Sequence, residues 1–371
     1  FDIRISDFST FGTPKVELND QNFIFHWRWL QENSMITDQY GRGVSYLRLS
    51  VTDRCNLRCF YCRSCKYLKF IPHQNILTYE EMFKIIQAGI ELGIQKVRLT
   101  GGEPFVRRDF LYFLARLRHK FPFLDLRVTT NGTLITNKVL ALKDMGINCI
   151  NISLDTLKPE KFQEITGRDF YHQVRAGIDR CLEENIRVKI NIVALKGVND
   201  NELEDFVQFA LTHPVDIRFI EFMPIGGRTM WNRDFYWPAK EIIRAVEKIT
   251  PLEPVNFKTS KCSPGSTSGP ARIFDLKEGQ GRLGVISPLS DHFCDRCNRL
   301  RITPDGKLRA CLFSDKEYRL LPLLRSPKLG PVQLKKVMER AGRKKPLGYN
   351  LLSKEKNRQS VCQRVMSSIG G

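Results

Sequence analysis

The sequence predicts an α/β protein in which parallel strands and helices alternate to form a full or partial barrel, followed by a smaller second domain. Three observations predict this fold. Short β-branched segments alternate with amphipathic segments between residues 45 and 221, which is the pattern of βαβ units with right-handed crossovers. Glycine-rich and polar motifs follow the predicted strands, where barrels of this type carry their chemistry. The 371 residues also exceed the usual size of one domain.

Six strands are predicted from short runs rich in β-branched residues, at 45–51, 96–100, 126–130, 149–154, 187–194 and 216–221. Amphipathic segments between and after them predict helices at 79–92, 108–119, 135–145, 171–184 and 201–211. Thr78 and Glu81 have the spacing of a capping box, which predicts the start of the first helix.

The chain is predicted to divide after a last helical segment at 239–249. Residues 251–270 are rich in Pro, Ser and Gly, which indicates a linker or a long loop across the barrel mouth. The predicted organisation is therefore an N-terminal extension at 1–44, a barrel at 45–250, a linker at 251–270 and a C-terminal domain at 271–371.

Five of the predicted strands end in, or are followed by, a distinctive sequence motif. The first is followed by CNLRCFYC, the second ends in LTGGEP, the third in TTNG, the fourth in SLD and the sixth in EFMP. Each motif alone is weak evidence, because Gly, Asn and Asp are common in turns. Parallel strands bring their carboxyl ends to one rim of a barrel, so the five motifs together predict a functional site there.

The motif after the first strand contains three cysteines, Cys55, Cys59 and Cys62, spaced C-x3-C-x2-C. Structural zinc sites normally have four protein ligands, whereas a catalytic metal keeps one position open. Iron–sulfur clusters are held by cysteine thiolates, normally one per iron, so three thiolates on a four-iron cluster leave one iron open. Cys65 follows at C-x2-C spacing, so a closed site with four thiolates is the alternative.

A second trio lies in the C-terminal part of the chain. Cys294 and Cys297 form HFCDRC, and Cys311 follows after thirteen residues. This trio also favours a cluster with one open iron. A zinc site of three cysteines and His292 is the alternative for this trio.

Composition limits the protein class. The net charge of +19 suggests a polyanionic partner, yet the basic residues are dispersed and no RNA-binding motif is visible. No apolar run approaches the length of a membrane span.

Cys149 and Cys181 are predicted core thiols, and Cys262 and Cys362 are assigned no role. Clustered thiolates favour a reducing intracellular compartment, and residues 1–40 lack the acid-poor character of a transit peptide.

The cysteine motifs, GGEP and SLD resemble those of the radical S-adenosylmethionine enzymes, and within them the GTP 3′,8-cyclases that begin molybdenum cofactor biosynthesis. The resemblance extends from about Asp38 to the terminal Gly-Gly. It implies a partial (βα)6 barrel of the TIM type and a C-terminal domain that carries a second iron–sulfur cluster. The chain departs from the family pattern after Cys62, where Arg63, Ser64 and Cys65 stand in place of Met-Pro.

The resemblance also implies the cofactors and the reaction. Two 4Fe–4S clusters and S-adenosylmethionine are expected, and the substrate is GTP. A 5′-deoxyadenosyl radical would abstract the 3′ hydrogen of the ribose, and C3′ would then bond to C8 of guanine. The protein would contribute mainly by positioning the reactants, because the cofactor supplies the chemistry.

Site residues follow from the same resemblance. The metal ligands would be Cys55, Cys59, Cys62, Cys294, Cys297 and Cys311. S-adenosylmethionine would contact Tyr61, Gly102, Ser153 and Met223. The GTP-binding positions would be Arg48, Arg98, Thr129, Lys189, Arg299 and Arg301. Gly370 and Gly371 would enter the catalytic pocket, since residues without side chains fit where others clash.

Implied partners are an electron donor such as a flavodoxin, a ferredoxin or a reductase, and a downstream cyclic pyranopterin monophosphate synthase. A homodimer is compatible with the resemblance, whereas membrane and nucleic acid are not expected partners. The compartment would be the mitochondrial matrix in a eukaryote or the cytoplasm in a bacterium. Two other hypotheses are another two-cluster radical enzyme, such as one that matures peptides, and a basic RNA-binding protein stabilised by zinc.

Overall fold

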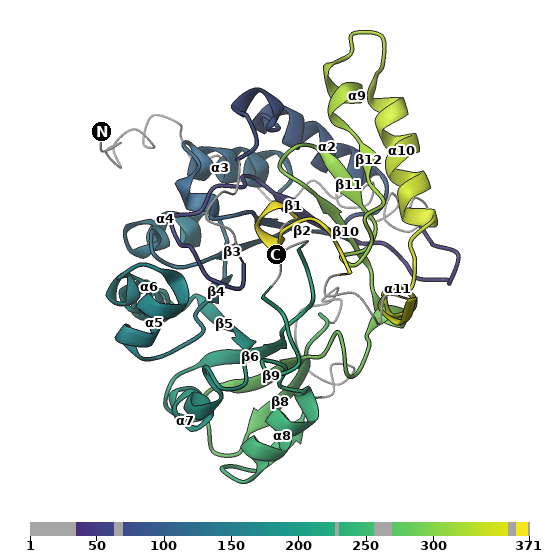
Figure 1. Ribbon diagram of the computed structural model, residues 1–371. Helices are drawn as coiled ribbons and strands as arrows, with labels where there is room; N and C mark the ends of the chain where they lie inside the picture. Colours follow the sequence, from purple (N-terminus) through teal and green to yellow (C-terminus); the bar gives the residue numbers. More distant parts are fainter. Residues whose placement is uncertain (1–34, 63–69, 227–229, 256–268, 355–360, 370–371) are drawn as a thin grey trace.

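The computed structural model describes residues 35–62, 70–226, 230–255, 269–354 and 361–369 (Figure 1). Its centre is a run of six neighbouring parallel strands, each within one residue of the predicted bounds. The strands are β1 (Tyr46–Ser50), β2 (Lys96–Thr100), β3 (Asp125–Thr130), β4 (Cys149–Ser153), β5 (Arg187–Ala194) and β6 (Val215–Glu221). The predicted βα barrel is therefore confirmed.

The C-terminal part of the chain extends this sheet at both edges. β10 (Arg299–Ile302) pairs in parallel with β1, and β9 (Arg282–Ile286) pairs in parallel with β6. Four short antiparallel strands complete the twelve-stranded sheet: β7 (Leu252–Pro254), β8 (Arg272–Leu276), β11 (Lys307–Arg309) and β12 (Tyr318–Arg319). β7 lies in the predicted linker 251–270, so the start of that segment is a sheet strand. The domain boundaries otherwise remain a prediction.

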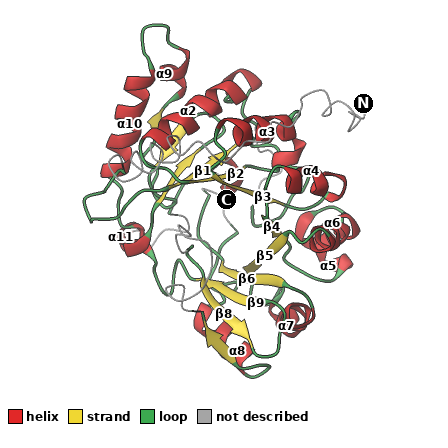
Figure 2. Cartoon of the chain, turned by 180° about the vertical axis from the view of Figure 1, so that it is seen from behind, coloured by secondary structure: helices red, strands yellow, loops and turns green. Residues whose placement is uncertain are grey.

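Helices cover the outside of the curved sheet, as Figure 2 shows from behind. They are α2 (Tyr79–Glu91), α3 (Phe110–Lys120), α4 (Val139–Asp144), α5 (Pro159–Thr166), α6 (Tyr171–Glu183), α7 (Leu203–Thr212) and α8 (Ala239–Glu247). The predicted capping box of α2 is present, because the Thr78 side chain accepts from the Glu81 N–H while the Glu81 carboxylate accepts from the Thr78 N–H. The sequence prediction missed α5, which ends at Gly167 in the left-handed conformation.

Three helices follow the last strands: α9 (Leu321–Arg325), α10 (Pro331–Arg343) and α11 (Gly348–Lys354). Short 3-10 turns occur at η2 (His73–Asn75), η3 (Pro104–Val106), η4 (Thr136–Lys138), η5 (Asp200–Glu202), η6 (Cys294–Arg296) and η7 (Met366–Ser368). α10 buries Leu334, Met338 and Ala341 on its apolar face, and Met338 lies against Gly89 of α2. The C-terminal part is therefore packed on the barrel.

Side chains alternate between the two faces of the barrel strands. On β5 the outward residues Val188, Ile190, Ile192 and Ala194 are fully buried under the helices, and they belong to the main hydrophobic core. Of the inward residues, Arg187, Lys189 and Asn191 are polar and Val193 is apolar. A TIM barrel usually fills its interior with branched apolar side chains. The polar interior of this barrel therefore indicates a cavity built for a ligand.

Candidate active site

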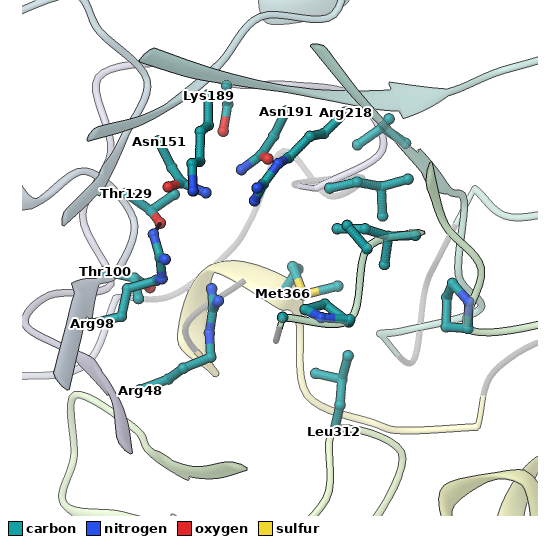
Figure 3. A pocket seen from close by; sticks show the side chains of 18 of the residues that line it. Arg48, Arg98, Thr100, Thr129, Asn151, Lys189, Asn191, Arg218, Leu312 and Met366 are labelled. Atoms are coloured by element: carbon teal, nitrogen blue, oxygen red, sulfur yellow. Dashed lines mark hydrogen bonds between the residues drawn. The ribbon is translucent and has the colours of Figure 1, made fainter. Parts of the chain in front are cut away.

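The inward faces of the strands enclose a cavity of about 680 Å³. Figure 3 shows side chains from several strands that point into it, among them Arg48, Arg98 and Lys189. Every predicted site residue that the structure describes lines this cavity: Arg48, Cys55, Cys59, Tyr61, Cys62, Arg98, Gly102, Thr129, Ser153, Lys189, Met223, Cys294, Cys297, Arg299, Arg301 and Cys311. Gly370 and Gly371 lie outside the described residues, as do Arg63, Ser64, Cys65 and Cys262.

Five of the six predicted GTP-binding residues lie in two rows across neighbouring strands, and the sixth, Arg299, is in register with Tyr46. Arg301, Arg48 and Arg98 are register partners on β10, β1 and β2. Thr129 and Lys189 are both in register with Asn151, on β3, β5 and β4. Strand register thus brings together residues that lie up to 253 positions apart in the chain. We call the first set the arginine row.

Tyr46 lies beside the arginine row and was not predicted. Arg98 Nε donates to the Tyr46 hydroxyl over 2.5 Å, and Arg98 Nη1 donates to Thr129 Oγ1 over 3.2 Å. Burial opposes ionisation of Tyr46, but the positive charges of Arg98, Arg48 and Arg299 outweigh it and lower the Tyr46 pKa to about 7. A tyrosine hydroxyl ordinarily ionises near pH 10, so this part of the cavity strongly favours negative charge.

The pKa values of two arginines in the row are also shifted by burial and by neighbouring positive charge. Burial, together with repulsion from Arg98 and Arg299, lowers the pKa of Arg48 to about 10 although Tyr46 opposes the shift. Burial and repulsion from Arg48 and Arg299 lower the pKa of Arg301 well below its usual value. Burying cations close together is costly unless anionic groups compensate them. A polyanionic ligand would relieve this cost.

Several residues that line the cavity also have buried polar atoms without partners among the described residues. Within the described part of the chain, no hydrogen-bond partner is found for Thr100 Oγ1, Asn151 Oδ1, Asn191 Oδ1 or Arg218 Nε. Buried polar groups in native proteins are nearly always hydrogen-bonded, so these atoms are candidates for ligand contacts. Arg218 and Asn191 were missed from the sequence. Their inward parity on β6 and β5 is the signal that could have found them.

The first cysteine trio lies on a loop whose start is hydrogen-bonded to the GGEP segment. Gly102 N–H donates to Thr52 O and Glu103 N–H donates to Arg54 O, each over 2.7 Å. A Cβ at Gly101 would lie 2.5 Å from Thr52 O, and one at Gly102 would lie 2.1 Å from Arg54 O. The glycines are thus required by the close approach of the cysteine loop.

All three cysteines of this loop line the cavity, and local contacts hold the loop in place. The Leu57 N–H lies 3.4 Å from Cys55 Sγ, and the loop backbone is hydrogen-bonded to α5 through Arg58 N–H and Thr166 O over 2.8 Å. Burial, and then the charges of Cys62 and Asp155, raise the pKa of Cys59. Tyr61 donates its hydroxyl to Asp155, whose other oxygen accepts from Val193 N–H over 2.8 Å.

The second trio lies on the opposite side of the cavity, close to the start of α11. A Cβ on Gly348 would lie 3.1 Å from Phe313 Cδ2, 3.2 Å from Cys311 Sγ and 3.4 Å from Cys294 Sγ, so a larger residue there would crowd these sulfurs. Lys345 is buried and donates to Arg299 O over 2.8 Å and to Ala310 O over 2.7 Å. Burial opposes ionisation of Cys297, but Lys345 and Arg299 lower its pKa to about 7.

A single zinc ion would draw its ligands onto one position, whereas cluster thiolates each bind a different iron. Among the described residues, no group of three or more His, Cys, Asp or Glu side chains is placed to hold a metal ion. His292, the alternative zinc ligand, is exposed, and its Nδ1 lies 2.7 Å from Pro288 O. Lys345 was not predicted, because a lysine three positions before a helix carries no local signal of burial.

Comparison with known proteins agrees with this geometry. Residues 49–210 match the Radical SAM superfamily, and residues 215–351 match Molybdenum Cofactor Synthesis C. The GTP 3′,8-cyclase of Alkaliphilus oremlandii is 40% identical over 335 residues, which is 90% of this chain and 99% of that protein. Molybdenum cofactor biosynthesis protein 1 of Drosophila melanogaster is 38% identical over 82% of this chain and 53% of its own length.

A solved structure shows the same fold. The crystal structure of Streptococcus suis SuiB bound to S-adenosylmethionine has a TM-score of 0.56 and 14% sequence identity, over 90% of this chain and 72% of that one. The described helices include none with the length and apolar character that a membrane crossing requires.

Proposed function

Because the chain belongs to the GTP 3′,8-cyclases of the radical S-adenosylmethionine superfamily, we propose that the barrel cavity binds GTP between the two cysteine trios and cyclises it there. The protein is an enzyme of molybdenum cofactor biosynthesis that uses S-adenosylmethionine and a 4Fe–4S cluster. The observation that carries the residue assignments is the single cavity that all the described candidates share.

Cys55, Cys59 and Cys62 would hold the first cluster. The residues present fit it, because the loop directs three thiols into the cavity and Gly101 and Gly102 leave room for its backbone. When bound, the cluster supplies the electron that cleaves S-adenosylmethionine and so begins the radical reaction. Tyr61, Gly102, Ser153 and Met223 would contact that cofactor. The Tyr61–Asp155 hydrogen bond would keep the tyrosine ring in place.

The arginine row and Lys189 would bind the triphosphate. Arginine suits this task because its planar fork donates two hydrogen bonds to one phosphate group. Burial, and then repulsion from Arg218, lower the pKa of Lys189 to about 8, so this lysine also gains from a phosphate partner. Arg299, with its guanidinium 5.0 Å from the Phe293 ring, would complete the set beside the second trio.

The second trio, Cys294, Cys297 and Cys311, would hold the second 4Fe–4S cluster and present its open iron to guanine. Gly348 leaves space for the sulfurs, and Lys345 stabilises the Cys297 thiolate. With the base held at this end and the phosphates at the arginine row, the ribose is fixed between them. Such positioning would favour hydrogen abstraction at C3′ and bonding of C3′ to C8.

The remaining assignments complete the proposal. Gly370 and Gly371 would enter the cavity, and an electron donor of flavodoxin, ferredoxin or reductase type would reduce the first cluster. The product would pass to a cyclic pyranopterin monophosphate synthase. A homodimer in a reducing compartment, the bacterial cytoplasm or the mitochondrial matrix, is part of the same proposal.

An anaerobic assay tests the function. Purified protein is reconstituted with iron and sulfide, then incubated with GTP, S-adenosylmethionine and a reductant. We expect about eight irons and eight sulfides per chain for two four-iron clusters, together with 5′-deoxyadenosine and a cyclised nucleotide. Cys294→Ser, Cys297→Ser and Cys311→Ser together should remove half of the iron. Zinc without labile sulfide, or 5′-deoxyadenosine without a cyclised nucleotide, would contradict the proposal.

A further inference from the structure

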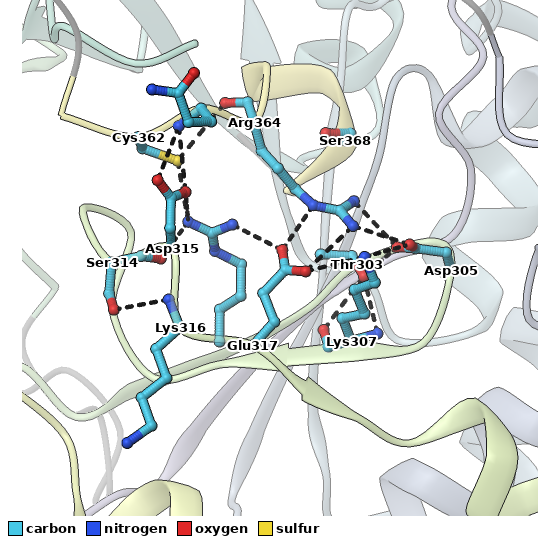
Figure 4. A network of polar contacts seen from close by, with 12 residues as sticks. Thr303, Asp305, Lys307, Ser314, Asp315, Lys316, Glu317, Cys362, Arg364 and Ser368 are labelled. Atoms are coloured by element: carbon cyan, nitrogen blue, oxygen red, sulfur yellow. Dashed lines mark hydrogen bonds and ion pairs between the residues drawn. The ribbon is translucent and has the colours of Figure 1, made fainter. Parts of the chain in front are cut away.

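The C-terminal tail, residues 361–369, crosses from one side of the barrel to the other over the cavity. On the β6 side it pairs with the segment after Met223: Val361 N–H donates to Pro224 O over 3.0 Å, and Gly226 N–H donates to Cys362 O over 2.8 Å. On the β10 side it meets a network of ion pairs, which Figure 4 shows. The tail is thus attached to both ends of the row of parallel strands.

Arg364 makes the central contacts of this network. Its Nη1 and Nη2 donate to the two oxygens of Asp305 over 3.2 and 3.0 Å, and its Nε lies 2.6 Å from Glu317 Oε1. Asp305 lies in the turn between β10 and β11, and Glu317 directly precedes β12. Two carboxylates from separate turns therefore bind the Arg364 guanidinium. Together they fix the position of this side chain more firmly than a single ion pair would.

Arg309 connects the same network to the start of the tail. It is fully buried at the end of β11, and its Nη1 donates to Glu317 Oε1 over 2.9 Å. Its Nη2 lies 3.0 Å from Cys362 Sγ. The Gln363 N–H in turn donates to both oxygens of Asp315 over 3.2 Å. Three successive tail residues, 362 to 364, are therefore held by side chains of the β11–β12 region.

The residues that follow Arg364 form part of the cavity wall. Met366 and Ser367 line the cavity, and Ile369 is fully buried. Ile369 belongs to a small apolar cluster that includes Ile225 and Phe313, with Met223 and Cys311 packed against it. The end of the described tail thus packs between a proposed cofactor contact and a proposed ligand of the second cluster.

We propose that Arg364 is a positioning residue for the cyclisation: its ion pairs with Asp305 and Glu317 fix the tail so that residues 366–369 close the cavity between the two cysteine trios. This inference rests on the proposed function of the cavity. Arg364 contacts neither trio and is absent from the cavity wall. Its effect would reach the reaction only through the placement of the tail.

The test compares Arg364→Ala and Arg364→Lys with the matched control Arg343→Ala, since Arg343 forms an exposed ion pair with Glu339 on α10. We expect Arg364→Ala to keep iron, sulfide and GTP affinity within twofold of wild type, because the arginine row is untouched. Cyclised product per 5′-deoxyadenosine should fall at least tenfold. Arg364→Lys should recover part of this loss, and the control should match wild type.

Hydrogen–deuterium exchange gives a readout that does not depend on activity. The amides of Val361, Ser368 and Ile369 are hydrogen-bonded in the tail, so their peptide should exchange at least tenfold faster in Arg364→Ala while β1 and β10 peptides remain unchanged. If the wild type shows no cyclisation, the proposed function fails, yet exchange still decides whether Arg364 places the tail. Unchanged tail exchange, or unchanged product yield in Arg364→Ala, would overturn the positioning role.

Asp305→Asn covers the case in which Arg364→Ala does not fold. It keeps the size of the side chain and its contact with Thr303 Oγ1, 2.5 Å away, but removes the charge that Arg364 pairs with. We expect the same two effects, faster exchange of the tail amides and less cyclised product per 5′-deoxyadenosine, but each should be smaller than in Arg364→Ala. If both variants lose their clusters, the pair stabilises the fold rather than placing the tail, and the inference is wrong.

Discussion

Tyr46 shows how much a single residue in this cavity depends on its charged neighbours. Its hydroxyl accepts from Arg98 and its ring lies 5.7 Å from Lys96 Nζ. As an uncharged group it leaves the full positive charge of the arginine row for GTP. As a phenolate it would neutralise part of that charge. The protonation state of Tyr46 should therefore influence nucleotide affinity near neutral pH.

Tyr46→Phe tests this influence. The Tyr46 pKa is lowered to about 7 by the neighbouring arginines, and a bound triphosphate should raise it, so GTP binding takes up a proton. Wild-type affinity should then fall by up to about tenfold between pH 6 and 8, and Tyr46→Phe should lose most of that dependence. Equilibrium GTP binding across this range is the measurement.

Two features keep this comparison interpretable. The phosphates of GTP and Lys189, whose pKa is about 8, titrate in both proteins, so only the difference between them reports on Tyr46. The exposed Tyr112 of α3 provides Tyr112→Phe as a control. Parallel pH profiles for wild type and Tyr46→Phe would show that Tyr46 does not ionise in this range.

Arg301→Ala should weaken GTP binding by about 10- to 100-fold, since a hydrogen bond to a charged group contributes about 1.5–3 kcal/mol. Cleavage of S-adenosylmethionine without GTP should persist, because the first trio lies on the loop after β1 whereas Arg301 lies on β10. Calorimetric titration with GTP measures the loss, and the exposed Arg319 supplies the control Arg319→Ala. GTP affinity equal to wild type would remove Arg301 from the phosphate site.

At the scale of elements, the GGEP segment and the cysteine loop behave as one unit. The loop follows β1 and the segment follows β2, and the two strands are in parallel register. Backbone hydrogen bonds from Gly102 and Glu103 continue this pairing beyond the strands. The glycines allow that continuation, so the shape of the cysteine loop depends on a neighbouring loop that is distant in sequence.

Gly102→Ala should therefore abolish the first cluster. A methyl group 2.1 Å from Arg54 O forces the backbone of the cysteine loop to move. We expect iron and sulfide to fall by about half with the second cluster retained, and S-adenosylmethionine cleavage to disappear. Gly330→Ala is the control, because a Cβ there meets only Gln333 at 3.8 Å. A fully loaded Gly102→Ala protein would contradict this role.

The sequence predicted what local patterns can encode at this scale. β2 and β5 have the predicted bounds, and the Thr78 capping box begins α2 as expected. Cys55, Cys59 and Cys62 could be recognised because their spacing is local. Arg218 and Lys345 could not, since their roles depend on strand parity and on burial by distant segments. The same is true of Arg364, whose partners Asp305 and Glu317 lie in turns about 50 residues earlier.

The whole molecule is built around one sheet rather than two separate cores. Residues after 250 supply β9 to the open edge of β6 and β10 to the open edge of β1. A sheet edge left without a partner is prone to associate with other chains. The predicted division at residue 250 thus separates segments that complete each other.

A chain truncated after residue 250 should be poorly soluble, because β1 and β6 both lose a parallel neighbour. Soluble yield and size-exclusion chromatography measure this, with the full-length chain expressed in parallel. Co-expression of residues 251–371 should restore part of the soluble material. A soluble, monomeric and folded 1–250 fragment would instead support an independent barrel domain.

The pairing of β1 with β10 also has a consequence during synthesis. Ser45 and Asn298 are hydrogen-bonded neighbours that lie 253 residues apart, and ribosomes add about 5–20 residues per second. The nascent chain therefore carries the exposed edge of β1 for roughly 10 to 50 seconds before its partner is made. The cysteine loop after β1 emerges during that interval, so chaperones and iron–sulfur delivery factors could reach it while the barrel is still open.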